Sequence, residues 1–502
     1  MKRLHQLAIL CLPLWLAGCA LTPPPAHVQA ETPAQWQAPT ATPSTTDDSA
    51  AAQLPHHGTL ADLSLWWQRQ NDALLVQLID AAQVVSPDVA SARARIEQSR
   101  ANAVAAGAAL LPTLDLGVSM QRSNIQRPLP LNTTSQAALQ PSWEIDVFGA
   151  NRATRRAAMA RYEGAQAGWH DARVAVAAEV ANRYYSLRNC EKLAEVTRAD
   201  AASRAETARL SRLSMQAGFE SPANAALADA SAAEAEGRAE QQQALCEIDL
   251  KALTALTAIE EPALRQRLSA SHMGVSDAVI AISSLPAQTL LQRPDVFIAE
   301  REVAAASAET GSAMAARYPR LTLSGSIGVA RFQSAGMSTD LQTWSIGPLQ
   351  LSLPLFDGGR RAADIDAARA NYESAVISYR STVRQAVREV EEALINLHST
   401  AARTEDAQHA VDGYRHSFEA TEARYRSGLA SLMELEDARR MRLSAELNAV
   451  SLERERLSAW VALYRAAGGG WRNPDQTDPA ARTTVASPAV LPSASPSTSV
   501  TD

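Results

Sequence analysis

The chain contains two copies of one unit, and this duplication restricts its possible folds more than any other feature. Four short landmarks occur twice in the same order, namely Pro87-Asp88-Val89 with Pro294-Asp295-Val296, Pro112-Thr113-Leu114 with Pro319-Arg320-Leu321, "WEIDVFGANR" (143–152) with "LSLPLFDGGR" (351–360), and "QAGFES" (216–221) with "RSGLAS" (426–431). The first two pairs have the same spacing, so no gap falls between them. The sequence therefore predicts two structural repeats rather than two unrelated domains.

Each repeat is predicted to run in the order helix, strand, strand, long helix, turn, helix. The first repeat (60–257) has helices expected at about 87–110, 150–216 and 222–257, and strands at about 113–122 and 136–147. The second repeat (294–471) has helices expected at about 294–317, 360–426 and 430–467, and strands at about 320–332 and 342–356. Pro112 and Pro319 stand at the two helix-to-strand switches, because proline disfavours continuation of a helix.

The remaining segments have different predicted roles. A shorter helix near 60–85, containing Trp66 and Trp67, precedes the repeated part of the first unit, and residues 258–293 form a linker between the repeats. Residues 472–502 are rich in Pro, Ser and Thr and are predicted to be a disordered tail.

The predicted strands have one apolar and one polar face. In "LPTLDLGVSMQ" (111–121), Leu114, Leu116, Val118 and Met120 alternate with polar or small residues. The other three strands repeat the pattern, with a change of phase at Gly347-Pro348 that predicts a bulge or a bend. Packing of the sheet on a helix in a soluble protein is one fate for such strands. Their length also matches the strands of outer-membrane barrels.

Four strands are too few to close a barrel, so a barrel would need several chains. Two copies would supply eight strands, whose interior is filled by side chains, whereas three copies would supply twelve and leave water inside. A pore therefore favours a trimer.

The N-terminus resembles a bacterial lipoprotein signal. Lys2 and Arg3 precede an apolar run that is too short to span a bilayer, and the run ends in Leu16-Ala17-Gly18-Cys19. We expect residues 1–18 to be removed, Cys19 to carry acyl chains, and residues 19–59 to form an extended tether. A coincidental cysteine in an ordinary signal peptide is the alternative. No other apolar run is long enough for a transmembrane helix, so strands would have to cross the membrane.

The two long helices are too long for a globular domain. Residues 150–216 and 360–426 would each extend roughly 100 Å as unbroken helices. In the second, the apolar residues recur close to every 3.5 positions, which predicts a coiled-coil seam formed by Tyr372, Val376, Tyr379, Val383, Ala386, Val390, Leu394 and Leu397.

Two cysteines are predicted to form a disulfide. Cys190 and Cys246 lie equally far from Gly218, where a turn between antiparallel helices is expected. Equal separation from the turn places the two thiols side by side, and an oxidising compartment permits the bond.

Catalysis, metal binding and nucleic-acid binding find no support in the sequence. The net charge is −7, and the arginines alternate with acidic residues along the helices. The histidines form no His-Glu-x-x-His pattern, and "AGGGW" (467–471) lacks the Lys-Ser/Thr of a phosphate loop. Asn132-Thr133-Thr134 is interpreted as an exposed hairpin loop. We expect no enzyme activity, no metal and no cofactor other than the lipid on Cys19.

Together these motifs resemble the TolC-like outer membrane efflux channels, specifically the NodT-type lipoprotein branch that serves tripartite RND-type pumps. The resemblance covers nearly the whole mature chain and is carried by "LAGC" (16–19), "WW" (66–67), "SWEIDVFG" (142–149), "RPDV" (293–296), "LPLFDGGR" (353–360), "YRSGLASLMELEDA" (425–438) and "AGGGW" (467–471). It implies a mainly helical homotrimer with a twelve-stranded barrel in the outer membrane and a helical tunnel in the periplasm. A periplasmic adaptor and an inner-membrane RND-type transporter would be its partners, and the channel itself would be passive.

The resemblance also implies roles at the tunnel tip. Tyr425, Glu434 and Asp437 match the positions that constrict the closed pore in such channels, although some relatives carry Arg where this chain has Ala430. Turn and adaptor-contact positions correspond to Gly218, Ser221, Gly428 and Ser431. A structural lipoprotein that bridges envelope layers and a type I protein secretion channel are the alternatives, and solvated helix surface is the alternative for each gate residue.

Overall fold

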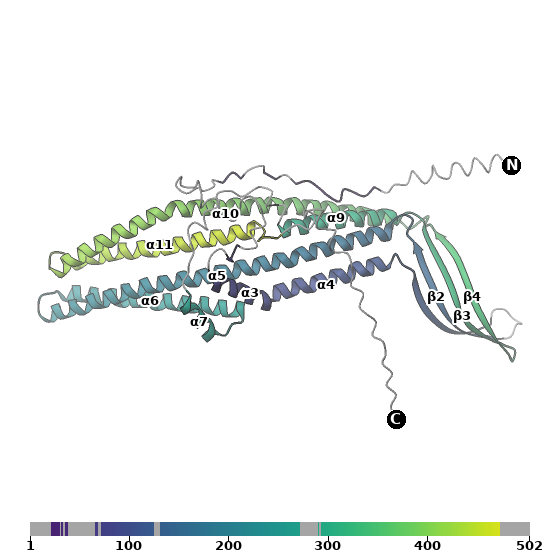
Figure 1. The fold of residues 1–502 in the computed structure, drawn as a ribbon, viewed down its shortest axis with the longest axis horizontal. Helices are drawn as coiled ribbons and strands as arrows, with labels where there is room; N and C mark the ends of the chain where they lie inside the picture. The colour runs from purple at the N-terminus through teal and green to yellow at the C-terminus, as the bar shows by residue number, and fades with distance from the viewer. Residues whose placement is uncertain are drawn as a thin grey trace, which may run out of the picture.

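The computed structural model describes residues 22–30, 32–33, 36–38, 66–68, 72–124, 131–271, 290 and 293–471. Its described part is elongated, with a small antiparallel sheet at one end and two helical hairpins at the other (Figure 1). The expected signal segment 1–18, the lipidation site Cys19 and the expected tail 472–502 lie outside the described residues, as does most of the expected tether 19–59.

The order of elements is the same in the two halves of the chain. The first half contains α3 (Ala73–Val85), α4 (Pro87–Ala108), β1 (Thr113–Ser123), β2 (Asn132–Ile145), α5 (Ala150–Gln216), α6 (Pro222–Thr257) and α7 (Glu261–Ala270). The second half contains α9 (Pro294–Ala315), β3 (Arg320–Ser334), β4 (Met337–Ser352), α10 (Arg360–Arg426) and α11 (Leu432–Ala466). The fold is therefore mostly helical with an antiparallel sheet, as the sequence predicts.

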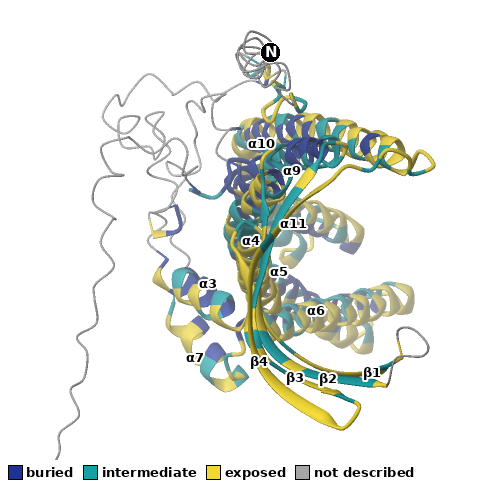
Figure 2. Cartoon of the chain, turned by 90° about the vertical axis from the view of Figure 1, so that its right-hand side faces the viewer, coloured by how far each residue is buried: buried dark blue, intermediate teal, exposed yellow. Residues whose placement is uncertain are grey.

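The four strands form one antiparallel sheet in the order β1-β2-β3-β4. Leu116 pairs with Leu139, Leu139 with Ile327, and Ile327 with Trp344, so one apolar row crosses all four strands. These four side chains are exposed in the single chain, and Figure 2 shows how much of the sheet is uncovered. The apolar face thus has no covering element among the described residues.

The predicted bulge lies at Gly347-Pro348. Ile346 pairs with Gly325 and Leu349 with Leu323, so two residues of β4 stand opposite Ser324 alone. Because of the extra residue, the side chains of Leu349 and Leu351 lie on the same exposed apolar face as that of Ile346. Bulges of this kind bend a strand and increase its local twist.

The polar segment Asn132-Thr133-Thr134 corrects one expectation. This segment begins strand β2 instead of forming a loop. Its three residues pair with residues 121–123 of β1 on one side and with residues 332–334 of β3 on the other. Partners on both sides satisfy the backbone N–H and C=O groups, and this outweighs the low strand preference of asparagine.

Each long helix starts at a glycine with positive φ. Gly149 (φ 80°) precedes α5 and Gly359 (φ 89°) precedes α10, a left-handed conformation that other residues adopt at a cost. Both helices have 67 residues, which corresponds to roughly 100 Å. Helix α5 packs against α4, α6, α9 and α11, so it joins the two halves of the chain.

The residues of the predicted seam on α10 are buried or half-buried. Val383, Ala386 and Val390 belong to the main hydrophobic core, together with residues of α3, α5, α6 and α11. The core is thus a long strip between helices, which agrees with the alanine-rich composition.

The tryptophan pair and the first helix differ from expectation. The helix begins at Ala73, and Trp66 and Trp67 lie on a separate turn before it. Trp66 stacks on Trp460 with ring centroids 4.5 Å apart, and Trp67 meets Tyr464 edge-on at 4.6 Å. Burial against these α11 rings determines the position of the turn, whereas the helical pattern alone did not reveal where the helix starts.

Helix α7 lies inside the segment expected to be a linker, where Leu264 and Leu268 are buried.

Among the described residues no single helix is long and apolar enough to span a membrane. Helices α3 and α4 pass that test only as a bent pair, by length and composition.

Candidate functional site

The candidate site lies at the free ends of the two hairpins, α5–α6 and α10–α11. Both turns end a helix in the same way, with Gly218 at φ 78° and Gly428 at φ 74°. The N–H of Phe219 donates to the carbonyl of Ser214 (2.9 Å), and the N–H of Leu429 donates to that of Arg424 (2.8 Å). This Schellman arrangement needs a left-handed residue, which explains glycine at both positions.

Serine starts the second helix of each hairpin. Ser221 Oγ accepts from the N–H of Asn224 (3.1 Å), and Ser431 Oγ accepts from the N–H of Glu434 (3.2 Å). These bonds satisfy backbone donors that have no partner inside the helix. Gly218, Ser221, Gly428 and Ser431 therefore have the predicted turn role in the structure, while adaptor contact stays a prediction.

Each turn exposes one large apolar side chain, and Met433 on the first turn of α11 is exposed as well. Phe219 and Leu429 directly follow the turn glycines and have 87% and 71% of their surface exposed. They occupy matching positions in the two repeats. An alignment of the repeats would therefore have identified them from the sequence alone. Paired apolar side chains on otherwise polar tips are suited to contact with another protein.

The three predicted gate residues have different environments. Tyr425 is half-buried and packs against a small cluster that contains Phe418 and Leu435, and burial raises the pKa of its phenol. Glu434 is exposed, and its carboxylate accepts from the N–H of Ser431 (2.7 Å), which completes a capping box. These hydrogen bonds lower the pKa of Glu434.

Asp437 is also exposed, and its carboxylate lies 2.7 Å from Arg440 Nη2. Glu434 and Asp437 are both on the first turns of α11, but each interacts with its own neighbour instead of with the other. Within one chain they thus provide two exposed negative charges near the tip.

A buried polar network behind the tip was not predicted. Arg439 of α11 is fully buried; its guanidinium contacts Glu436 (2.5 Å) on the same helix and donates to Thr207 Oγ1 (2.9 Å) on α5. Burial lowers the pKa of Arg439. The phenyl ring of Phe418 on α10 lies 5.6 Å below the same guanidinium.

Glu436 connects this arginine to a second one. Its other oxygen contacts Arg204 of α5 and accepts from Ser231 Oγ of α6 (2.8 Å). Arg204 also forms a salt bridge with Asp200 (2.9 Å). Because the network contains residues of α5, α6 and α11, it ties the two hairpins together.

The sequence signal for this network was ambiguous. Glu436 and Arg439 are three apart, and Asp200 and Arg204 four apart, a spacing that usually indicates surface pairs on a solvated helix. Only the packing of α11 against α5 removes these charges from water.

Cys190 of α5 and Cys246 of α6 are joined by a disulfide, with Cα atoms 5.4 Å apart. The bond lies on the same hairpin as the Gly218 turn. No group of three or more His, Cys, Asp or Glu residues suited to a metal ion occurs in the described ranges.

A third buried arginine, Arg293 of the "RPDV" motif, links the end of the second repeat to its beginning. Its guanidinium contacts Asp295 (2.7 Å) and Glu389 (2.7 Å) and donates to the carbonyl of Ala466 (3.1 Å). The side chain is buried, so the motif has a structural role between α9, α10 and α11.

Comparison with known proteins assigns the chain to a family. Residues 78–258 and 285–469 match the outer membrane efflux protein family, and the chain belongs to that family. It is 29% identical to the solvent efflux pump outer membrane protein SrpC of Pseudomonas putida, covering 91% of this chain and 97% of that protein. It is 28% identical to nodulation protein T of Rhizobium leguminosarum bv. viciae, covering 96% and 97% respectively.

Solved structures agree with this assignment. The outer membrane protein VceC of Vibrio cholerae superimposes with a TM-score of 0.72 at 27% identity, covering 82% of this chain and 99% of that chain. The CmeC channel of Campylobacter jejuni, at 24% identity, gives a TM-score of 0.74 over 84% and 90% and supports the fold. The chain is an outer membrane efflux protein with a TolC-like fold, and its family is one of channels and not of enzymes.

Proposed function

We propose that the protein is the passive exit duct of a tripartite efflux system, assembled as a homotrimer. The observation that carries this proposal is the sheet: four strands with an apolar exposed face, and edge strands β1 and β4 that lack an outer partner within the described chain. Pairing of β4 with β1 of the next copy would satisfy both edges and produce a closed barrel of twelve strands.

The helical part would then continue the pore through the periplasm. The long helices leave the sheet at one end and reach the hairpin tips at the other (Figure 1). Small molecules are the proposed cargo, since the similar proteins include a solvent efflux pump component and the pyoverdine export protein OpmQ of Pseudomonas putida. An inner-membrane RND-type transporter would supply the energy, and a periplasmic adaptor would contact the tips through Phe219 and Leu429.

The channel would be gated at the tips. The network of Arg204, Glu436 and Arg439 supports this because it binds α11 to α5 behind the tips, where the pore entrance would lie. Glu434 and Asp437, repeated three times around the axis, would form two negatively charged rings that attract cations. Tyr425 would contribute bulk to the constriction.

Lipidation of Cys19 is part of the proposal and would anchor the chain in the outer membrane beside the barrel. The described N-terminal residues run along the helical body: the N–H groups of Gln37 and Ala38 donate to the Glu391 carboxylate (2.8 and 2.7 Å). Such contacts would hold the tether against the outside of the assembly.

Single-channel recording in planar bilayers tests the function. The purified protein should migrate as a trimer in detergent and conduct ions, and deletion of the gene should increase susceptibility to small amphipathic compounds. A trimer that stays closed even after Glu434 and Asp437 are neutralised would favour a structural lipoprotein. Loss of an exported protein, with unchanged susceptibility, would favour a type I secretion channel.

A further inference from the structure

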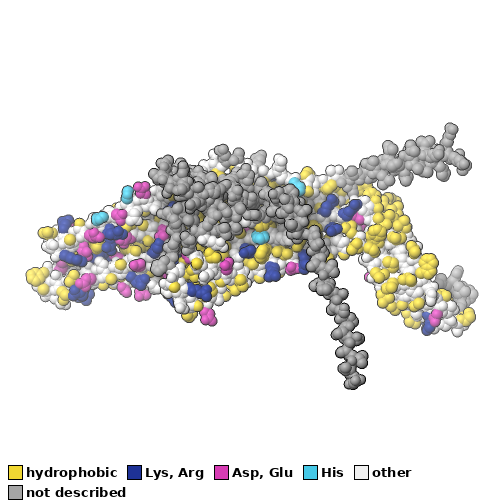
Figure 3. Space-filling model, viewed as in Figure 1, with side chains coloured by type: hydrophobic (Ala, Val, Ile, Leu, Met, Phe, Trp, Pro, Cys, Tyr) yellow, Lys and Arg dark blue, Asp and Glu magenta, His cyan; other side chains and the backbone are white. Residues whose placement is uncertain are grey.

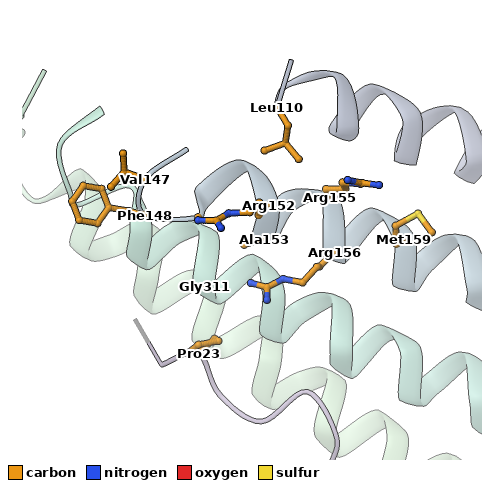
Figure 4. Close-up of a pocket in the computed structure, with 11 residues that line it drawn as sticks. Pro23, Leu110, Val147, Phe148, Arg152, Ala153, Arg155, Arg156, Met159 and Gly311 are labelled. Carbon is orange, nitrogen blue, oxygen red and sulfur yellow. The ribbon is translucent and has the colours of Figure 1, made fainter. Parts of the chain in front are cut away.

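A basic pocket lies where the sheet joins the helices. It has a volume of about 670 Å³ and is lined by three arginines of α5 together with apolar side chains of α5 and of the α4–β1 and β2–α5 connections (Figure 4). Its lining includes Arg152, Arg155, Arg156, Leu110, Val147 and Met159. The pocket combines positive charge with an apolar wall, and Pro23 of the N-terminal segment forms part of its rim.

Two of the three arginines are available for a ligand. Arg152 is engaged by Asp146, to which its Nε donates over 3.2 Å. Arg155 and Arg156 are exposed, and within the described part of the chain neither forms a hydrogen bond or salt bridge. Figure 4 shows the Arg156 side chain extending toward Pro23, and Arg155 lying on the side of Leu110. Asp146 is neutralised by Arg152 and by two backbone N–H groups, so it does not oppose an anion here.

The surroundings of the pocket have the character of a membrane interface. Trp143 of β2 donates from Nε1 to the carbonyl of Leu110 (3.0 Å). Phe148 stacks on Tyr318 at 4.9 Å, and Phe356 is 92% exposed at the equivalent strand-to-helix connection. Aromatic side chains concentrate where lipid headgroups meet hydrocarbon. On the face shown in Figure 3, Lys and Arg side chains also gather where the helices meet the apolar sheet.

We infer that this pocket binds an anionic phospholipid of the periplasmic leaflet. The headgroup would lie over this part of α5, where the guanidinium groups of Arg155 and Arg156 can each donate to phosphate oxygens, and an acyl chain would lie along Leu110 and Val147 toward the sheet. The inference rests on the proposed function, because the orientation of the chain in the outer membrane places the pocket at that leaflet.

The acyl groups expected on Cys19 are a less suitable occupant. Cys19 is only four residues before Pro23, so its acyl chains would enter the same leaflet nearby. They carry no anionic group, however, and would leave both guanidinium groups without a partner. Phospholipid therefore satisfies the charge and the apolar wall together.

The test measures lipid retention by the full-length trimer. Protein in detergent is mixed with phosphatidylglycerol or with phosphatidylcholine, and bound lipid is counted by native mass spectrometry. We expect preferential retention of phosphatidylglycerol, and its weakening by roughly 25-fold in the R155Q/R156Q variant, since each arginine near an anionic surface contributes about fivefold. The R155K/R156K variant should retain most of the preference, because it keeps both charges.

The matched control is R380Q/R384Q, which removes two exposed arginines from α10, far from the sheet. An equal loss in this control would show a general charge effect and overturn the site, as would the absence of any preference in the unmodified trimer. A preference that appears only in C19S would assign the pocket to the protein's own anchor, and complete competition by inorganic phosphate would assign it to free phosphate. Ion conductance measured on the same samples separates the two proposals, because a conducting trimer without lipid preference contradicts only this inference.

Discussion

Arg439 of α11 donates a hydrogen bond to Thr207 of α5 over 2.9 Å, and the arginine has no exposed surface. A fully buried guanidinium is stable only while its partners remain in place, since moving an unpaired charge out of water costs several kcal/mol. The two hairpins are therefore connected by a group whose partners would have to be rearranged if the tips moved apart. This makes the network the most direct way to test the proposed gate.

Replacement of Glu436 by glutamine should weaken the tip. Arg204 and Arg439 would lose the carboxylate that neutralises both, and breaking a buried pair typically costs about 3 kcal/mol or more. We expect E436Q to lower the free energy of unfolding by about that amount and to increase single-channel conductance. The control is E455Q, which removes a half-exposed partner of Arg403 and should cost less than about 1 kcal/mol. Equal effects of the two variants would contradict a role for the network.

Neutralisation of the two acidic tip residues should reduce cation selectivity. In E434Q/D437N the proposed trimer would lose two rings of negative charge, so the ratio of cation to anion permeability, measured from reversal potentials in a salt gradient, should fall. The E405Q/D406N variant removes the same charge from exposed positions of α10 further from the tip and serves as the control. A fall of the same size in both variants would argue against these particular rings.

Reduction of the disulfide should destabilise the α5–α6 hairpin. Cys190 and Cys246 are 56 residues apart, and closure of a loop of this size stabilises a folded protein by about 4 kcal/mol in the chain-entropy model. A reducing agent should therefore lower the thermal midpoint of the native protein and leave that of C190S/C246S unchanged. Detection of two free thiols by mass spectrometry in the oxidised mature protein would contradict the bond.

Acidification should loosen the start of α11. The hydrogen bonds from Ser431 stabilise the Glu434 carboxylate and lower its pKa below the ordinary value of 4.5. The capping contribution is therefore fully present above that ordinary value and is lost as the pH falls through the lower pKa of the folded state. The protection of the backbone amides of residues 432–435 against hydrogen exchange, measured relative to the intrinsic rate at each pH, should decrease in that range.

The other hairpin provides the control for this experiment. Helix α6 has the same serine cap at Ser221 but carries Asn224 in place of the glutamate, and the N–H of Ser221 donates to the carboxylate of Glu220 (3.2 Å) instead. In an E220Q background this cap contains no carboxylate, so the protection of α6 should show no such pH dependence. The S431A variant should lose about 1 kcal/mol of cap stabilisation and with it the pH effect. If the protection at the start of α11, corrected for the intrinsic exchange rate, did not change as the pH falls from about 5 to about 3, the carboxylate would have no capping role.

Much of the fold follows from short-range patterns. The bounds of α5 and α10 coincide with the expected 150–216 and 360–426, because glycine and serine mark the ends of these helices in the sequence itself. The alternation in the strands predicted one apolar face, and the change of phase at Gly347-Pro348 predicted the bulge. The start of α3 could not be located in this way, since Trp66 and Trp67 were assigned to a helix although they lie on a turn packed against Trp460 and Tyr464.

The candidate site likewise combines features that the sequence predicts with features that depend on helix packing. The turn at Gly428, the cap at Ser431 and the carboxylate of Glu434 were identifiable from the sequence, because each depends on residues no more than four positions away. The burial of Arg439 and the bridge from Arg204 to Glu436 depend on how α5, α6 and α11 pack, over separations of more than 200 residues. Local hydrogen bonding and periodicity are properties of neighbouring residues, whereas the removal of a charge from water is a property of the assembled helices, and only the tertiary structure decided it.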